Sequence, residues 1–252
     1  MRRTALITGS THGIGAATAI MLAANDYNVI ICGRDQHAAA EVQHEVESLG
    51  YVCPVILQDV TYDNAAEKIL EQAKDMNVTI LINNVGGGGR WGKQGIMDTL
   101  PMIWKDVYQK NIGIAQQLTK GLAPNMLKNK FGRVITISSI YAFDIQGKPW
   151  FTMAKAAEAV FMKALSKDKD LVRSGITFNT IAPGNILTKG TGWDLIRIDD
   201  PAKYAALEEL HPMGHYGTPN DVANMILYLC SDKASFINGA YIAVDGGESN
   251  VI

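Results

Sequence analysis

The stretch Thr8-Gly9-Ser10-Thr11-His12-Gly13-Ile14-Gly15 joins a short apolar run at residues 4–8 to a segment of helical spacing at residues 13–24. Glycines in such a turn allow a tight reversal, a close approach of the backbone to a pyrophosphate and close packing of helix on strand. A tight strand-to-helix turn without a ligand has a similar composition, so the stretch alone is weak evidence. It predicts one βα unit, with residues 9–15 as candidate contacts to a bound nucleotide.

The alternation seen at this turn continues along the chain. Short β-branched runs are followed by longer segments of helical spacing, which is typical of repeated βα units and a parallel sheet. We expect strands near residues 4–8, 28–32, 52–57, 78–82, 132–138, 175–181 and 240–244, and helices near 13–24, 36–48, 63–75, 99–128, 150–172 and 219–231. Residues 183–212 are expected to be irregular. No linker or repeat divides the chain, so the pattern predicts a single α/β domain over residues 1–252, a three-layer αβα doubly wound parallel sheet of the Rossmann type.

The overall composition is that of an ordinary globular protein. The 252 residues are 47% hydrophobic and 19% charged, and 23 Lys and Arg against 25 Asp and Glu give a net charge of −2. This balance excludes a disordered chain and gives no reason to expect a nucleic-acid partner. No apolar stretch reaches membrane-spanning length, so no membrane association is expected.

The cysteine pattern indicates a reducing compartment. Cys32, Cys53 and Cys230 are odd in number and widely spaced, so neither a disulfide framework nor a thiolate zinc site is expected. The polar turn after residues 5–7 interrupts any signal-peptide core. We therefore expect a cytoplasmic protein.

The end of the second expected strand bears on the choice of nucleotide. NAD-binding enzymes usually place a carboxylate at this strand tip for the ribose 2′-hydroxyl, whereas an Arg suits a 2′-phosphate. Here Gly33 takes the carboxylate place, Arg34 follows it and Asp35 lies one step beyond. NADP(H) is therefore preferred and NAD(H) remains an alternative, as does a surface role for Arg34. Asp59 either meets the adenine edge or caps the next helix.

Several motifs in order make the chain resemble the short-chain dehydrogenase/reductase family, and the resemblance covers nearly the whole sequence. The matches are the turn at residues 8–15, Asp59-Val60, Asn83-Asn84-Val85-Gly86, Asn111, Ile137-Ser138-Ser139, the run from Asn179 through Pro183, Gly184 and Ile186 to Thr188, and Val244-Asp245-Gly246-Gly247. The resemblance implies an NAD(P)-dependent oxidoreductase similar to 3-oxoacyl-carrier-protein reductases. It also implies cofactor contacts from Val60, Asn84, Gly86, Lys155, Pro183, Gly184, Ile186 and Thr188.

One position departs from the family pattern. The family works with Ser, Tyr, Lys and a helix Asn, with Tyr and Lys spaced Tyr-x-x-x-Lys. In that arrangement the phenol moves a proton and the ammonium lowers the phenol pKa. Here the stretch reads Phe151-Thr152-Met153-Ala154-Lys155, so the phenol is replaced by a ring that has no proton to move. Loss of a positioned acid typically costs about 10²–10⁴-fold in rate.

Four explanations of Phe151 stay open. It is an engineered Tyr→Phe change, or another phenol substitutes, or the chemistry needs no phenol, or the chain only binds its ligand. Tyr141 is the nearest candidate substitute, although it equally fits a pocket wall.

The resemblance leaves two candidates for the catalytic serine. Side chains alternate along a strand, so one of Ser138 and Ser139 faces the cofactor. Motif alignment favours Ser139, while the spacing of 13 residues to position 151 usual in many members fits Ser138. We expect the catalytic set Asn111, Ser139 and Lys155, with Ser138 in reserve.

The helix around Lys155 predicts self-association. Met153, Ala156, Ala157, Val160, Phe161, Ala164 and Leu165 form a wide apolar stripe. The family commonly pairs this helix and the one at residues 99–128 with a second copy, so the resemblance implies a homodimer or homotetramer.

The remaining motifs concern metals and substrate. His211 and His215 have i, i+4 spacing, but Pro and Gly between them break the helix that such a pair needs, so no metal site is expected. Residues 86–93 are expected to form a flexible loop and residues 185–212 a substrate lid, in which Lys189, Trp193 and Arg197 are candidate anion contacts or surface side chains.

Two functions follow from these expectations. The first is an NADP-dependent oxidoreductase that acts on a small alcohol or carbonyl compound. The second is a cofactor-binding pseudoenzyme with a regulatory or assembly role. Asn111, Ser139 and Lys155 favour the first, and Phe151 favours the second.

Overall fold

The β-branched runs of the chain form one parallel sheet in the computed structural model, which describes residues 2–87, 95–145 and 147–250. The strand order is β3-β2-β1-β4-β5-β6-β7. The strands are β1 (Thr4–Thr8), β2 (Asn28–Gly33), β3 (Val55–Leu57), β4 (Val78–Asn83), β5 (Gly132–Ile137), β6 (Ile176–Pro183) and β7 (Tyr241–Val244). From β1 the sheet is extended on one side by β2 and β3 and on the other side by β4 to β7. This arrangement confirms the predicted doubly wound Rossmann-type sheet.

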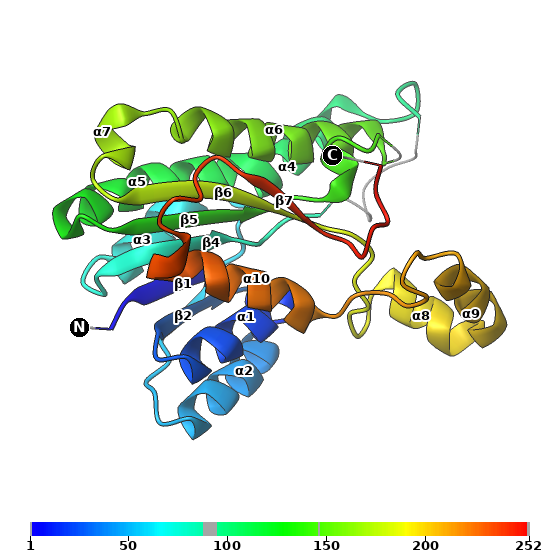
Figure 1. Cartoon of the computed structure of the whole chain (residues 1–252), viewed down its shortest axis with the longest axis horizontal. Helices are drawn as coiled ribbons and strands as arrows, with labels where there is room; N and C mark the ends of the chain where they lie inside the picture. Colours follow the sequence, from blue (N-terminus) through cyan, green and yellow to red (C-terminus); the bar gives the residue numbers. More distant parts are fainter. Residues whose placement is uncertain (1, 88–94, 146, 251–252) are drawn as a thin grey trace.

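Helices cover both faces of this sheet (Figure 1). One face carries α1 (Gly13–Ala24), α2 (Gln36–Ser48) and α10 (Pro219–Cys230). The other carries α3 (Ala65–Ala73), α5 (Ile114–Asn129) and α6 (Pro149–Leu165). Alternate side chains of each strand enter the two cores, as Ile7 and Leu6 do on β1. Both faces of the sheet are buried under helices. The strands are therefore continuous apolar runs in the sequence.

Two predicted helices are interrupted in the structure. The segment at 99–128 is α4 (Pro101–Tyr108), a π-turn η1 (Gln109–Gly113) and α5, and the segment at 150–172 is α6 followed by α7 (Lys169–Val172). The π-turn contains Asn111, and single π-turns inside helices often occur at functional sites. Short 3₁₀ turns, η2 (Ile140–Ala142) and η3 (Asp232–Ala234), complete the elements.

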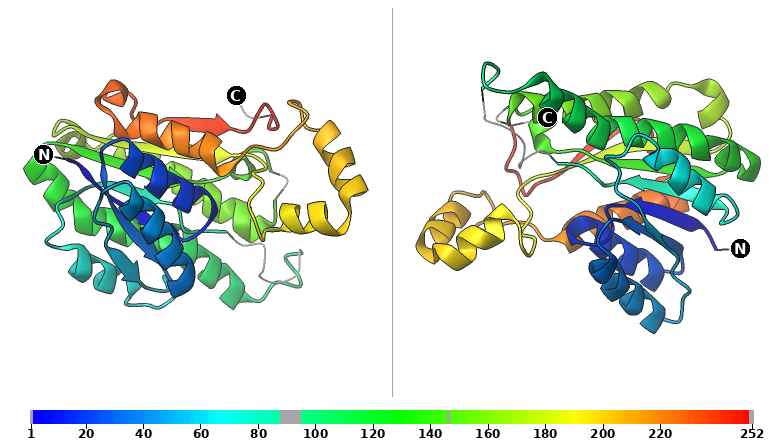
Figure 2. Two further views of the ribbon diagram at one scale, coloured as in Figure 1. Left: turned by 90° about the horizontal axis from the view of Figure 1, so that it is seen from below. Right: turned by 180° about the vertical axis from the view of Figure 1, so that it is seen from behind.

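The expectation that residues 183–212 are irregular is wrong. They contain α8 (Gly192–Asp199) and α9 (Pro201–Glu209), which extend beyond the carboxyl ends of the strands (Figure 2). Asp200 accepts a hydrogen bond from the Lys203 amide and Pro201 occupies the first turn of α9, which are ordinary helix-start signals.

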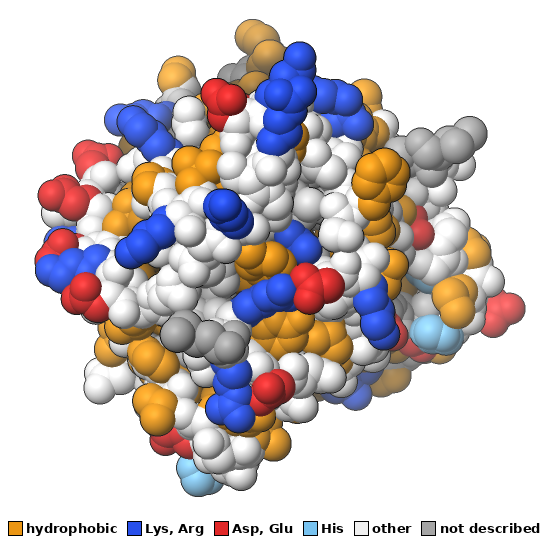
Figure 3. All heavy atoms as spheres, turned by 60° about the vertical axis from the view of Figure 1, so that its left-hand side comes forward, with side chains coloured by type: hydrophobic (Ala, Val, Ile, Leu, Met, Phe, Trp, Pro, Cys, Tyr) orange, Lys and Arg blue, Asp and Glu red, His pale blue; other side chains and the backbone are white. Residues whose placement is uncertain are grey.

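Figure 3 shows Lys and Arg interspersed with acidic and apolar side chains on one face. None of the described helices has the length and apolar character needed to cross a membrane.

Candidate active site

The carboxyl ends of the strands enclose a cavity of about 880 Å³. Its walls come from the β1–α1 turn and the ends of β4, β5 and β6, together with η2, α6 and α8. The predicted residues that line it are Ile14, Asn84, Gly86, Ser138, Ser139, Tyr141, Phe151, Lys155, Pro183, Gly184, Ile186 and Thr188. Ligands of doubly wound sheets bind at this edge, so the topology brings the predicted nucleotide and catalytic segments together.

The glycine-rich turn is held in place by Asn84. Its Nδ2 donates to the carbonyl oxygens of Thr8 (2.9 Å) and Gly9 (3.0 Å). A Cβ on Gly15 would overlap the Gly9 carbonyl, so this position admits only glycine. No side chain caps the amino end of α1 at His12, which leaves the first amides of the helix for an anion. The turn therefore fits the pyrophosphate of a dinucleotide.

Ser10 has a structural place in this turn. It is fully buried, donates to the Ile7 carbonyl oxygen and accepts from the Cys32 amide, and so ties β1 to β2. Gly13 has a positive φ of 54° and lies against Thr188 of the segment after β6. The turn and the base of the 185–212 segment are thus in contact.

A second cavity of about 260 Å³ lies beside Arg34, and Gly9, Thr11, His12, Asp59 and Val60 are among its lining residues. Arg34 Nη1 is 3.0 Å from Asp59 Oδ2. Burial raises the pKa of Asp59, but hydrogen bonds from Thr61 and Arg34 outweigh this effect and the net shift is downward. The guanidinium and carboxylate are therefore both charged at this cavity.

The neighbouring positions explain why no carboxylate follows β2 at this edge. Asp35 accepts from the Ala38 amide and caps α2 instead. A Cβ on Gly33 would overlap the Thr11 side chain, so an acidic residue there would require the turn to move.

The two candidate serines have different surroundings. Ser138 is buried, and its Oγ donates to the Lys155 backbone carbonyl at 2.7 Å, which fixes β5 to α6. Ser139 is half-buried, and its Oγ accepts from the Tyr141 amide at 3.2 Å. The hydroxyl proton of Ser139 remains available for donation to a further partner. The hydroxyl proton of Ser138 is already donated to the Lys155 carbonyl.

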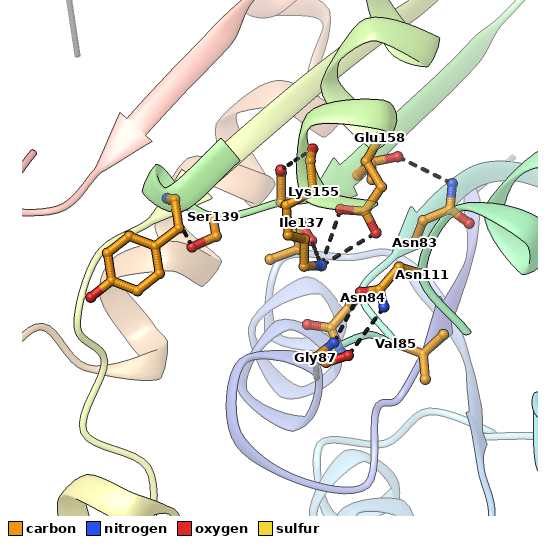
Figure 4. A network of polar contacts seen from close by, with 12 residues as sticks. Asn83, Asn84, Val85, Gly87, Asn111, Ile137, Ser139, Lys155 and Glu158 are labelled. Atoms are coloured by element: carbon orange, nitrogen blue, oxygen red, sulfur yellow. Dashed lines mark hydrogen bonds and ion pairs between the residues drawn. The ribbon is translucent and has the colours of Figure 1, made fainter. Parts of the chain in front are cut away.

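Asn111 and Lys155 meet across the backbone of Gly86 (Figure 4). Asn111 Oδ1 accepts from the Gly87 amide, and its Nδ2 donates to the carbonyls of Val107 and Gly87. A Cβ on Gly86 would lie 2.7 Å from Asn111 Oδ1 and 2.8 Å from Lys155 Nζ. The close approach of these two side chains thus depends on glycine at this position.

Lys155 is buried and has a partner that the sequence analysis did not identify. Its Nζ donates to the Ile137 carbonyl (2.9 Å) and lies 3.0 Å from Oε2 of Glu158. Complete burial raises the pKa of Glu158 to about 7, although the charge of Lys155 lowers it. The available signal was an acidic residue three positions after Lys155, on the buried face of α6 that also carries Ala154 and Met162.

Neither aromatic candidate provides an activated phenol. Phe151 lines the cavity, and its ring centroid is 5.9 Å from Lys155 Nζ. Tyr141 also lines the cavity, but burial and the carboxylates of Glu248 and Asp144 raise its pKa. A raised pKa makes this phenol a weaker acid than an ordinary tyrosine.

The remaining predicted features lie around the cavity or outside it. Trp193 and Ile196 of α8 line the cavity, whereas Arg197 pairs with Asp194 of the same helix. Residues 88–93 of the expected loop lie outside the described residues. In residues 2–87, 95–145 and 147–250 no three His, Cys, Asp or Glu side chains gather as a metal site would require.

Comparison with known proteins gives the same assignment as the geometry. A family model described as enoyl-(acyl carrier protein) reductase matches residues 9–249. The chain is 31% identical to the uncharacterized oxidoreductase YmfI of Bacillus subtilis, over 98% of this chain and 99% of that protein. It is also 31% identical to the 3-oxoacyl-[acyl-carrier-protein] reductase FabG of Aquifex aeolicus, over 97% and 96% of the two chains.

Solved structures share the fold over nearly the full length. L-sorbose reductase of Gluconobacter frateurii, complexed with NADPH and L-sorbose, has a TM-score of 0.89 at 26% identity and covers 100% of this chain and 98% of its own. A 3-oxoacyl-(acyl-carrier-protein) reductase of Agrobacterium tumefaciens with NADP bound has a TM-score of 0.89 at 28% identity, over 97% and 93%. The chain belongs to the short-chain dehydrogenase/reductase family of NAD(P)-dependent oxidoreductases.

Proposed function

We propose that this protein is an NADP-dependent oxidoreductase that interconverts a small alcohol and a carbonyl compound, with slow or altered turnover because Phe151 replaces the catalytic phenol. The observation that carries the proposal is the meeting of the open α1 amino end, Arg34 and the Asn111–Lys155 pair at one edge of the sheet. A nicotinamide cofactor, when bound, would supply or accept the hydride.

Different residues of this chain would bind different parts of the cofactor. The turn at residues 9–15 would hold the pyrophosphate, Arg34 the 2′-phosphate, and Asp59 with Val60 the adenine end. Lys155 would donate to the nicotinamide ribose, and Asn84 holds the turn that supports this arrangement. Pro183, Gly184, Ile186 and Thr188 line the same cavity and would flank the nicotinamide.

The acid–base step is the weak part of the proposed site. Ser139 would orient the substrate oxygen, and Asn111 holds the backbone of Gly87 through two hydrogen bonds. The half-buried hydroxyl of Tyr141 is the alternative phenol, although its pKa is raised. The proposed reaction therefore has residues that would position the substrate and the cofactor, but no activated proton donor.

A pseudoenzyme that binds NADP(H) and acts by regulation or assembly is the second candidate. Phe151 and the engagement of Lys155 by Glu158 favour it. The two candidates share the cofactor site and differ only in turnover, so one set of assays separates them.

The substrate cavity favours a compact apolar carbonyl compound. The segment at residues 185–212 would act as its lid, and Trp193 and Ile196 of α8 present apolar surface to the cavity. Because several relatives are named 3-oxoacyl-[acyl-carrier-protein] reductases, 3-oxoacyl thioesters belong in the first substrate panel.

Assembly and location complete the proposal. The single-domain chain would form a homodimer or homotetramer, since Met153 and Val160 of α6 are 44% and 59% exposed. A cytoplasmic location fits three free, buried thiols.

The proposal is tested by titrating the protein with NADPH and then following NADPH oxidation with the carbonyl panel. Saturable binding with turnover supports the oxidoreductase, and binding without turnover of any carbonyl supports the pseudoenzyme. Lys155→Ala should weaken NADPH binding clearly, and the absence of binding by the wild type would contradict both candidates.

A further inference from the structure

A fully buried carboxylate lies behind the proposed cofactor site. Glu158 is 1% exposed and projects from α6 among apolar side chains that include Ala154 and Met162. Burial of an ionised carboxylate is costly unless it is paired. An apolar residue would fill this position better if packing were its only role. The buried carboxylate of Glu158 therefore indicates a further role.

The partner of Glu158 is the ammonium group of Lys155. Both carboxylate oxygens face Nζ, at 3.2 Å for Oε1 and 3.0 Å for Oε2. The two side chains are 1% and 5% exposed, so water screens this pair very little. Figure 4 shows the pair beside Asn111, and Lys155 is the member of the pair that lines the cavity.

The hydrogen-bond capacity of Lys155 limits what else it can hold. An ammonium group has three donors. One donates to the Ile137 carbonyl, and the contacts to Glu158 engage the donors on that side. A ribose hydroxyl that binds Lys155 must therefore compete with Glu158 for the ammonium group.

We propose that Glu158 is a positioning residue for Lys155: its carboxylate retains the ammonium group at the cavity wall and thereby sets how strongly Lys155 binds the ribose of a nicotinamide cofactor. The inference rests on the proposed function, because it takes Lys155 as a cofactor contact. Ionised Glu158 retains Lys155, and protonated Glu158 releases it toward the cavity.

The charges around Glu158 make this competition depend on pH. α6 packs on η2, β6, α4, η1 and β5. η2 carries Tyr141 and η1 carries Lys110, but the Glu158 pKa is shifted by burial and by Lys155. Lys105 and Asp106 of α4 are exposed, β6 has no charged residue, and the charge on β5 is Arg133, which donates to carbonyls at the amino end of the strand. Asn83 and Asn111 in the same network are neutral amides. Lys155 is thus the charge that acts on Glu158, and burial raises the Glu158 pKa to about 7.

The test compares NADPH dissociation constants of the wild type and Glu158→Gln, an uncharged side chain of the same shape, by fluorescence titration across neutral pH. Titration of the cofactor phosphate is common to both proteins and cancels in the ratio. We expect the ratio of the two NADPH dissociation constants, wild type over Glu158→Gln, to be near one at about pH 6. At about pH 8.5 we expect the wild type to bind NADPH about three- to tenfold more weakly than the variant. In a Lys155→Met background, Glu158→Gln should change nothing.

Two results would overturn the inference. One is a ratio that stays constant with pH or falls to one or below at high pH, and the other is an effect of Glu158→Gln that persists without Lys155. If Glu158→Gln does not fold, the wild type and Lys155→Met decide instead, since the contribution of Lys155 to affinity must then be larger at low pH. A wild type that binds no NADPH overturns the proposed function as well, whereas binding with a flat ratio overturns only the role of Glu158.

Discussion

Gly86 decides how closely the candidate catalytic side chains approach one another. Its Cα lies between Asn111 Oδ1 and Lys155 Nζ, where a methyl group would be within 2.8 Å of both. The two side chains come from η1 and α6, and Asn111 and Lys155 are 44 positions apart in the sequence. The absence of a side chain at Gly86 therefore allows both the Asn111 amide and the Lys155 ammonium group to approach its backbone.

Gly86→Ala should weaken NADPH binding by at least about tenfold, because the added methyl displaces Asn111 or Lys155 by a few tenths of an ångström or more. Titration of the variant checks this expectation. Gly95→Ala is the matched control, since its Cβ would make only an ordinary 3.5 Å contact with Asp98. Equal losses in both variants would contradict a specific role for Gly86.

Arg34 should determine the preference for NADPH over NADH. A charge-assisted contact to the 2′-phosphate is worth about 1.5–3 kcal/mol, which corresponds to roughly 10–150-fold in affinity. Arg34→Ala should lose most of this preference, as measured by parallel titrations with the two cofactors. An unchanged affinity ratio in the variant would show that Arg34 serves only its ion pair with Asp59.

Some helices could be predicted from the sequence with their bounds, and others could not. The sequence pattern predicted both bounds of α1 and α2 correctly, because apolar residues recur at helical spacing along both segments. α8 and α9 were missed, since α8 has only eight residues and α9 has no distinct apolar face, and the evidence for α9 is the cap at Asp200-Pro201 rather than periodicity. The π-turn around Asn111 could not be predicted, because its backbone bonds leave no periodic pattern in a segment that reads as one helix.

The same difference applies to the candidate site. Residues carried by motifs, such as Lys155 and Asn84, lie at the cavity as expected. Glu158 was not found, because its importance depends on complete burial, and a charged residue in an amphipathic stripe ordinarily lies at the solvent edge.

The exposed apolar side chains of α6 should mediate self-association. Val160→Asp places a charge on this surface and should shift the protein to a smaller assembly, as measured by light scattering after size exclusion. Val52→Asp is the control, since Val52 is 83% exposed and lies between α2 and β3, away from this helix. A wild-type monomer, or an assembly that both variants retain, would contradict an interface at α6.

The doubly wound sheet couples the site to the stability of the protein, because α6 contributes both to a core layer and to the cavity. Met162 lies in the core, while Lys155 and Glu158 of the same helix form the buried pair. Changes in the charge of this pair should therefore appear in global unfolding as well as in binding.

Glu158 should make unfolding depend on pH. Its pKa is raised from 4.5 to about 7 in the folded protein, so folding favours the protonated form. The stability of the wild type relative to Glu158→Gln should fall as pH rises from the unfolded value through about 7, by on the order of 1–3 kcal/mol. Urea unfolding of both proteins at about pH 5 and pH 8 measures this, with exposed Glu67→Gln as the control. A difference that does not change with pH would show that Glu158 keeps one charge state throughout.

The central claim is that this fold retains a reductase site which is limited by the side chain at position 151. The rate of NADPH-dependent reduction across a carbonyl panel tests it most directly, compared between the wild type and Phe151→Tyr. The Phe151 ring centroid is 5.9 Å from Lys155 Nζ, in the cavity that Ser139 also lines. A phenol at this position should therefore raise turnover at least about tenfold, within the range that a positioned acid supplies. If Tyr141 already serves as the acid, Tyr141→Phe would abolish turnover and Phe151→Tyr would add little. Turnover that neither substitution changes, on any carbonyl tested, would contradict the claim and favour the pseudoenzyme.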